Sequence, residues 1–230
     1  MRSSNLGVVV VSMAALLASC AALSGTNQPE APPDLGWLFD SITFEIAPIT
    51  SAEPSPRALD TFRNRLHENH LCRRENVSFI MRRTVAGPPP GMPWSSGLLT
   101  GYESLRRSAH DDDPLDRDLK VFVAYIDGPW LEGGTLRFLG GLQYGPSAFA
   151  IFKSGAGDRE ASVLLHEFGH VLGLVKVETS ENHDPVHTHH CVIRSCVMYW
   201  CAPGPDSNFD LYCRRQIFAM IRARDVDDED

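Results

Sequence analysis

Residues 166–173 read His-Glu-Phe-Gly-His-Val-Leu-Gly, the pattern H-E-x-x-H-x-x-G, inside an apolar run that begins at Ala161. Side chains four residues apart share one face of a helix, so the imidazoles of His166 and His170 can hold one metal ion. Glu167 lies between them, where its carboxylate can reach a water on that metal. The stretch predicts a helix that carries a zinc site for hydrolysis.

The residues around this pattern favour a buried helix that ends at Gly173, where the chain can turn sharply. Its apolar members are Val163, Leu164, Phe168, Val171, Leu172 and Leu174. The alternative is a core helix that carries two histidines without a metal. Two imidazoles and a carboxylate are costly in such a helix unless they have a role, so we prefer the metal site.

A catalytic zinc usually has three protein ligands and one open position. The simplest place for the third ligand, three residues after Gly173, holds Lys176, which is a poor ligand. Histidines follow further on, and the spacing leaves His190, His183 and His187 open. A downstream carboxylate is also open, because related zinc peptidases use one. The candidates of that kind are Glu178, Glu181 and Asp184.

The next segment reads His190-Cys191-x4-Cys196-x-Met198. This order resembles the archaemetzincins, within the metzincin clan of zinc peptidases. The resemblance covers residues 160–200, and more faintly the chain from about residue 41. It implies His190 as the third ligand, Zn2+ as the cofactor, and Met198 in a turn below the metal.

The same resemblance implies an α/β fold of the α+β zincin type. A mixed, twisted sheet and the active-site helix would form an upper subdomain above a lower one. Archaemetzincins also end with C-x-x-C, which contributes to a second, structural zinc site. Here Cys213 is followed by Arg214, Arg215 and Gln216, so the pattern of that second site is incomplete.

Residues 1–19 predict a signal peptide, since Arg2 precedes an apolar run that is too short for a confident membrane span. The run ends in Leu17-Ala18-Ser19-Cys20, which looks like a bacterial lipobox with Cys20 as the lipidated residue. An ordinary secretory signal cleaved near Ala22 is the alternative. We therefore expect export, either as a lipoprotein of the outer membrane or cell surface, or as a secreted or periplasmic protein.

Five cysteines remain beyond residue 20. An oxidising compartment favours disulfides, and the expected pairs are Cys191 with Cys196 and Cys201 with Cys213. Cys72 is then left over, as an odd number requires. The competing interpretation places Cys191, Cys196, Cys201 and Cys213 on a structural zinc.

The rest of the chain fits one catalytic domain over residues 37–224, after a tether at 20–36 and before an acidic tail at 225–230. The net charge is −8, and the sequence has no basic run, so nucleic acid is not an expected partner. The expected partner is a protein or peptide substrate. We expect a monomer that meets the membrane only through the anchor at Cys20.

Hydrophobic periodicity predicts strands and helices in the order of a metzincin upper half. Strands are expected at 42–47, 77–82, 119–126 and 147–153, and helices at 56–70, 98–109 and 209–222. The metzincin resemblance implies that the strand 147–153 is the edge strand that borders the cleft and pairs with an extended substrate. The glycine-rich stretch 133–145 is expected near it.

These observations predict a zinc-dependent endopeptidase, with Glu167 as the general base that activates a water. One alternative is an exported metal-binding or surface interaction protein with a degenerate peptidase fold. The presence of Glu167 argues against it, because metal binding alone does not need that residue. The other alternative is a zinc hydrolase of non-peptide amides.

Overall fold

The computed structural model describes residues 35–49, 52–89, 92–107, 117–176, 181–201 and 204–227 of the 230-residue chain. The predicted signal peptide, Cys20, most of the tether and the last residues of the acidic tail lie outside these ranges. Within them, no helix is long and apolar enough to cross a membrane.

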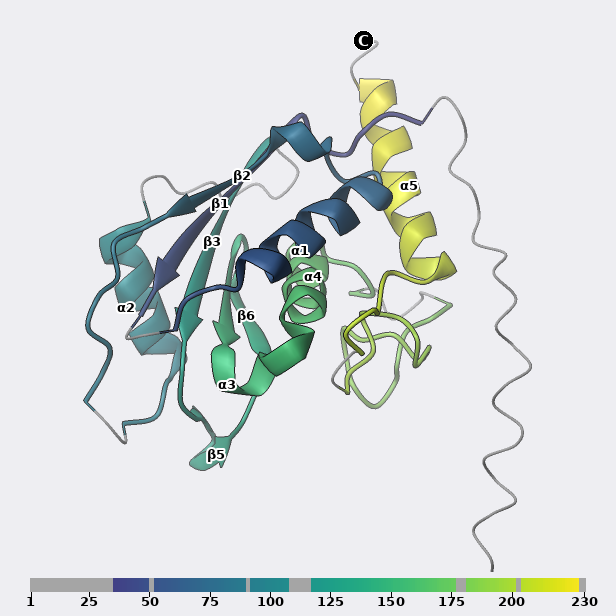
Figure 1. Ribbon diagram of the computed structural model, residues 1–230. Helices are drawn as coiled ribbons and strands as arrows, with labels where there is room; N and C mark the ends of the chain where they lie inside the picture. The colour runs from purple at the N-terminus through teal and green to yellow at the C-terminus, as the bar shows by residue number, and fades with distance from the viewer. Residues whose placement is uncertain are drawn as a thin grey trace, which may run out of the picture. The chain divides into compact units, whose positions relative to one another are not determined.

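A five-stranded mixed sheet organises the first part of the described chain (Figure 1). Its strands, in spatial order, are β2 (Val77–Met81), β1 (Ser41–Pro48), β3 (Asp118–Ile126), β7 (Ala148–Phe152) and β6 (Gly141–Gly145). Only β6 runs antiparallel to its neighbour, and the other pairs are parallel. This confirms the predicted mixed α/β sheet.

The central strand β3 is covered on both faces, and its alternate residues belong to two apolar clusters, as the period of two in a strand requires. Leu119, Val121, Val123 and Tyr125 pack in one cluster, and Phe122, Ala124 and Ile126 in the other. The first cluster includes side chains of α1 (Pro56–Glu68) and α4 (Glu160–Val171). The second includes Leu99 of α2 (Ser96–Arg106).

The prediction that residues 147–153 form the edge strand is wrong. Residues 147–153 contain β7, which lies between β3 and β6, and all of β7 is buried. An unbroken apolar strand of this kind is typical of the sheet interior. The edge on that side is β6, which comes from the glycine-rich stretch and is only half-buried.

A small hairpin precedes β6 and was not predicted. It consists of β4 (Trp130–Glu132) and β5 (Thr135–Arg137). Gly133 and Gly134 form its turn with φ angles of 54° and 80°. Consecutive glycines with positive φ are typical of tight hairpin turns, so the signal was present in the sequence.

Helix α4 ends as predicted. Gly173 has a φ of 71°, its N–H donates to the carbonyl of His170, and the N–H of Leu174 donates to that of Gly169. This pair of bonds is a Schellman cap, in which glycine takes the left-handed position. The one-turn helix α3 (Lys153–Ala156) precedes α4.

Beyond Gly173, the described chain has little regular structure until α5 (Leu211–Asp227). That helix extends past the predicted end at residue 222, into the stretch expected as an acidic tail. The chain therefore changes character at Gly173, from a sheet-bearing part to a part with little regular structure, as the predicted upper and lower subdomains require.

Candidate metal centre

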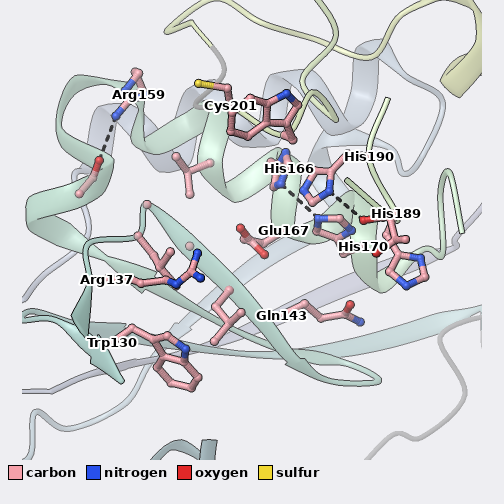
Figure 2. A pocket seen from close by; sticks show the side chains of 18 of the residues that line it. Trp130, Arg137, Gln143, Arg159, His166, Glu167, His170, His189, His190 and Cys201 are labelled. Carbon is pink, nitrogen blue, oxygen red and sulfur yellow. Dashed lines mark hydrogen bonds between the residues drawn. The ribbon is translucent and has the colours of Figure 1, made fainter. Parts of the chain in front are cut away.

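Three histidines predicted as metal ligands lie together in the structure (Figure 2). His166 and His170 come from α4, and His190 comes from the segment that follows it. The ring centroids of His166 and His170 are 4.7 Å apart, and that of His190 lies 5.3 and 5.0 Å from them. One nitrogen of each ring lies within 4.8 Å of the others, so a single ion can contact all three.

Backbone carbonyls orient two of these rings. The Nδ1 atom of His166 lies 2.6 Å from the carbonyl oxygen of Val197, and that of His190 lies 2.9 Å from the carbonyl oxygen of Thr188. A carbonyl accepts only from a protonated nitrogen, so each bond places the proton on Nδ1. Nε2 is then left with its lone pair, as a metal ligand requires.

Burial also keeps these rings neutral. It lowers the pKa of His166 to about 4, and it lowers the pKa values of His170 and His190 as well. Because a protonated imidazole cannot bind a metal, the site is ready for an ion at neutral pH without first releasing protons.

Glu167 is the buried carboxylate of the same site. Its side chain lies within the protein, the residue being 3% exposed, and its Oε2 atom has no hydrogen-bond partner. Burial raises the pKa of Glu167 to about 8, against a smaller opposing effect of the Gln143 backbone N–H. A buried carboxylate oxygen without a partner is costly. A cation and its water beside Glu167 would remove that cost, so these residues fit a zinc ion.

Met198 packs directly against the active-site helix. A Cβ atom at Gly169 would lie 2.3 Å from the Sδ atom of Met198, and Met198 itself is fully buried. Gly169 therefore lets the predicted Met-turn approach the helix between the two ligands. The sequence carried a signal for this contact, because a glycine inside a helix lowers its stability and usually has a packing reason.

Gly141 of the edge strand β6 also allows a close contact with α4. A Cβ atom there would lie 2.6 Å from both Cγ and Oε1 of Glu167, and 2.8 Å from Val163. Sequence analysis missed this residue, since the contact joins β6 to α4 across a distance in the chain that no local pattern reports. Gly141 is thus required for Glu167 to keep its position.

We expect Gly141→Ala to lower kcat by about 10- to 100-fold, because a displacement of about 1 Å in an active site can have that effect. Overpacking should also cost about 1–3 kcal/mol of stability. Measurements of kcat and of thermal unfolding test this. Gly101→Ala is the control, since a Cβ atom there meets nothing within 4 Å. A normal kcat in Gly141→Ala would show that Glu167 tolerates the displacement.

The three histidines open into a cleft of about 630 Å³. The cleft is lined by β6, the β4–β5 hairpin, α4 and residues 188–190 and 200–201. Figure 2 shows Glu167 close to His166 and His170 within this cleft. Phe138 and Trp200, which are 81% and 44% exposed, add apolar surface.

The other candidate third ligands lie outside the group of three. The ring of His187 stacks on Trp200 at 4.0 Å, and its Nδ1 atom lies 3.0 Å from a carboxylate oxygen of Asp184. His183 forms a backbone bridge to Cys191. Glu181 is exposed, and Glu178 lies outside the described residues. The structure thus brings His190 to the pair on α4, and its role as ligand stays a prediction.

The expected disulfides are absent from the described residues, where all five cysteines are free. Cys201, predicted to pair with Cys213, is exposed. Cys213 instead lies with Cys191 and Cys196, and the fourth member of the group is Asp210. The competing interpretation, four cysteines around one metal, is thus corrected to three cysteines and a carboxylate.

This second cluster has the chemistry of a zinc site. The Sγ atoms of Cys196 and Cys213 are 3.6 Å apart, and the Sγ atom of Cys191 lies 3.3 Å from Oδ2 of Asp210. Zinc–sulfur bonds of about 2.3 Å in a tetrahedron would separate two sulfur atoms by about 3.8 Å. The amide of Asn182 also points at Cys191 and Cys213, at 3.4 and 3.3 Å.

Sequence analysis missed Asp210. The signal was Asp210-x-x-Cys213, which has the spacing of C-x-x-C with the carboxylate in the first position. A cysteine was expected on the C-terminal side of Cys213, whereas the fourth candidate ligand precedes it.

No protein-family model matches the sequence, and no curated protein matches it either. The chain is similar in structure to an archaemetzincin. That protein is from Methanopyrus kandleri, and the match has a TM-score of 0.49 and 16% sequence identity over 79% of this chain and 96% of that one.

A second similar structure is metalloproteinase-II from Bacteroides fragilis, with a TM-score of 0.47 and 14% identity. The match covers 83% of this chain and 55% of that one, so the chain spans about half the length of the Bacteroides protein. We base the functional proposal on the side chains of the site itself.

Proposed function

We propose that this protein is a zinc-dependent endopeptidase. The observation that supports this most directly is the convergence of three neutral imidazoles beside Glu167, whose Oε2 atom is buried without a partner. A zinc ion held by His166, His170 and His190 would supply a Lewis acid for the scissile carbonyl and lower the pKa of a water at its open position.

Glu167 moves the proton. In the absence of a cation, burial would leave this carboxyl protonated at pH 7, since its pKa is raised to about 8. A divalent cation beside it lowers the pKa and favours the carboxylate. Glu167 then accepts a proton from the attacking water and gives it to the leaving amine, and a pKa close to neutral suits both transfers.

The edge strand supports a polypeptide substrate over a small amide. Among the described residues, β6 pairs only with β7, so its outer edge offers backbone groups to an extended chain. The backbone N–H of Gln143 on this strand contacts the carboxylate of Glu167, and both residues line the cleft (Figure 2). An extended peptide on β6 would therefore pass the metal centre.

The second cluster is proposed as a structural zinc site on Cys191, Cys196, Cys213 and Asp210. It ties the segment that carries His190 to the start of α5, because Cys191 follows His190 directly and Cys213 belongs to that helix. Three thiols cannot all pair with one another, whereas a zinc ion satisfies all three and the carboxylate.

Metal analysis with a digestion assay tests both sites. We expect two zinc ions per wild-type chain, and digestion of an unfolded protein that chelation stops and added zinc restores. His170→Ala should keep one zinc and lose digestion. Cys196→Ser should also keep one zinc and unfold at a lower temperature.

Cys201→Ser is the control, because this exposed thiol belongs to neither cluster, and it should keep both ions. A wild-type chain that takes up no zinc would exclude the peptidase. A chain that takes up zinc but digests no protein, in the wild type as in His170→Ala, would favour a metal-binding protein or an amide hydrolase.

A further inference from the structure

Among the described residues, the lining of the cleft carries more cationic than anionic side chains, histidines left aside. Its charged lining residues, apart from histidines, are Glu132, Arg137, Arg159, Glu167 and Lys176. Arg137 forms an ion pair with Glu132 at 2.9 Å, and Glu167 faces the metal centre. Arg159 and Lys176 remain, in a chain whose net charge is −8. A cationic cleft in an acidic protein attracts anionic groups.

Arg159 is the better placed of these two cations. It is half-buried, whereas Lys176 is exposed. Among the described residues, the one hydrogen bond of its side chain goes to the carbonyl oxygen of Gly155, at 3.1 Å, and no carboxylate pairs with it. The neighbouring Glu160 is occupied by Tyr125 and Lys153. The guanidinium thus keeps donors for a ligand that enters the cleft.

The position of Arg159 in the chain gives its approximate distance from the metal centre. It directly precedes α4, eight residues before Glu167, and a helical rise of about 1.5 Å per residue gives about 12 Å along the axis. An extended peptide covers that distance in about three to four residues. Figure 2 shows Arg159 and His189 on opposite sides of the metal centre. Val163 and Leu139 add apolar walls at the Arg159 end.

We propose that Arg159 is a specificity-determining residue that binds a substrate carboxylate three to four residues from the cleaved bond. This inference rests on the proposed peptidase function and names the substrates that the site selects, peptides with an acidic group at that distance. The carboxylate is the side chain of Asp or Glu, or the C-terminus of a short peptide. A guanidinium suits both, because its parallel N–H groups match the two carboxylate oxygens.

The test uses a peptide series with one cleavable bond, in which Asp, Asn or Lys is placed at each position in turn. Every peptide is made with a free and with an amidated C-terminus. We expect wild type to favour Asp over Asn by about tenfold or more in kcat/KM at one position, since hydrogen bonds between charged groups have effects of this size. The difference should lie mainly in KM, because the contact is remote from the reacting atoms.

Arg159→Gln should bring the Asp-to-Asn ratio close to one, and Arg159→Glu should favour Lys at the same position. Arg83→Gln is the control, because this exposed arginine is not part of the cleft. It should keep the wild-type ratio. A preference for free over amidated peptides that Arg159→Gln removes identifies the C-terminal carboxylate as the ligand, and an Asp-over-Asn preference that amidation leaves unchanged identifies the side chain.

The inference would be overturned, with the peptidase intact, if wild type preferred neither Asp over Asn at any position nor a free over an amidated C-terminus, or if such a preference persisted in Arg159→Gln. Failure to cleave any peptide would overturn the proposed function instead. In that case, equilibrium binding of the Asp and Asn peptides to wild type and to Arg159→Gln tests whether Arg159 binds a carboxylate. Equal binding of both peptides to both proteins would exclude the carboxylate site.

Discussion

Glu167→Gln is expected to lower kcat by about 10²–10⁴-fold, the usual loss when a general base is removed. Glutamine has nearly the same shape as glutamate, so it fits the narrow space against Gly141. It cannot accept the proton of the attacking water. The zinc content should stay at the wild-type level, since Glu167 is not one of the three residues proposed as ligands. The measurements are kcat on a peptide and zinc per chain.

A comparison of unfolding temperatures distinguishes this loss of catalysis from misfolding. Burial raises the pKa of Glu167 to about 8, so without a metal this carboxyl must take up a proton on folding at pH 7, a cost that an amide does not carry. Before metal binding, Glu167→Gln should therefore unfold at the same temperature as wild type or at a higher one. Glu181→Gln is a matched control, because Glu181 is exposed and was itself a candidate ligand. Near-normal turnover in Glu167→Gln would mean that another group takes the proton.

The active-site helix could be predicted from sequence because its determinants are local. The spacing of His166 and His170, the apolar periodicity and the cap at Gly173 all lie within a few helical turns. The strand at 119–126 was equally clear, since an apolar run of that length is typical of a buried strand. The structure places both elements within two residues of the predicted bounds.

The elements that were missed depend on contacts between distant residues. Strand β6 is glycine-rich, so its sequence has no strand periodicity, and it becomes the edge through pairing with β7. Gly141 matters only because Glu167 lies against it. Asp210 joins the cysteines through the folding of the chain after Gly173, and an aspartate that begins a helix usually reads as a cap.

The resemblance to archaemetzincins and the structure both favour His190 as the proposed third ligand. Spacing alone left several histidines and carboxylates open, because the segment after Gly173 has no regular structure that would fix its path. The order His190-Cys191-x4-Cys196-x-Met198 selected His190. In the structure, Cys191 and Cys196 belong to the second cluster, and Met198 packs on Gly169. The chain that directly follows His190 is therefore anchored at these three residues.

His190→Ala is expected to weaken zinc binding at the catalytic site by more than about 100-fold. Loss of a residue that only supports a ligand typically has an effect of 10- to 100-fold, and loss of the ligand itself should exceed it. His183→Ala and His189→Ala should bind zinc nearly as wild type does. His187→Ala should have an intermediate effect, since the His187 side chain stacks on Trp200 and pairs with Asp184, whose backbone N–H donates to the carbonyl of His190.

Zinc titration of the four variants against a competing chelator measures these affinities, and the second site must be followed separately. Cobalt substitution does this, because thiolate ligands give a charge-transfer band that imidazole ligands lack. The band should persist in all four variants, since none changes Cys191, Cys196, Cys213 or Asp210. A largest loss in His183→Ala or His187→Ala would place the third ligand in the segment before His190. The part of the cleft lining formed by residues 188–190 would then differ from that described, because His189 and His190 line the cleft only in the present path of the chain.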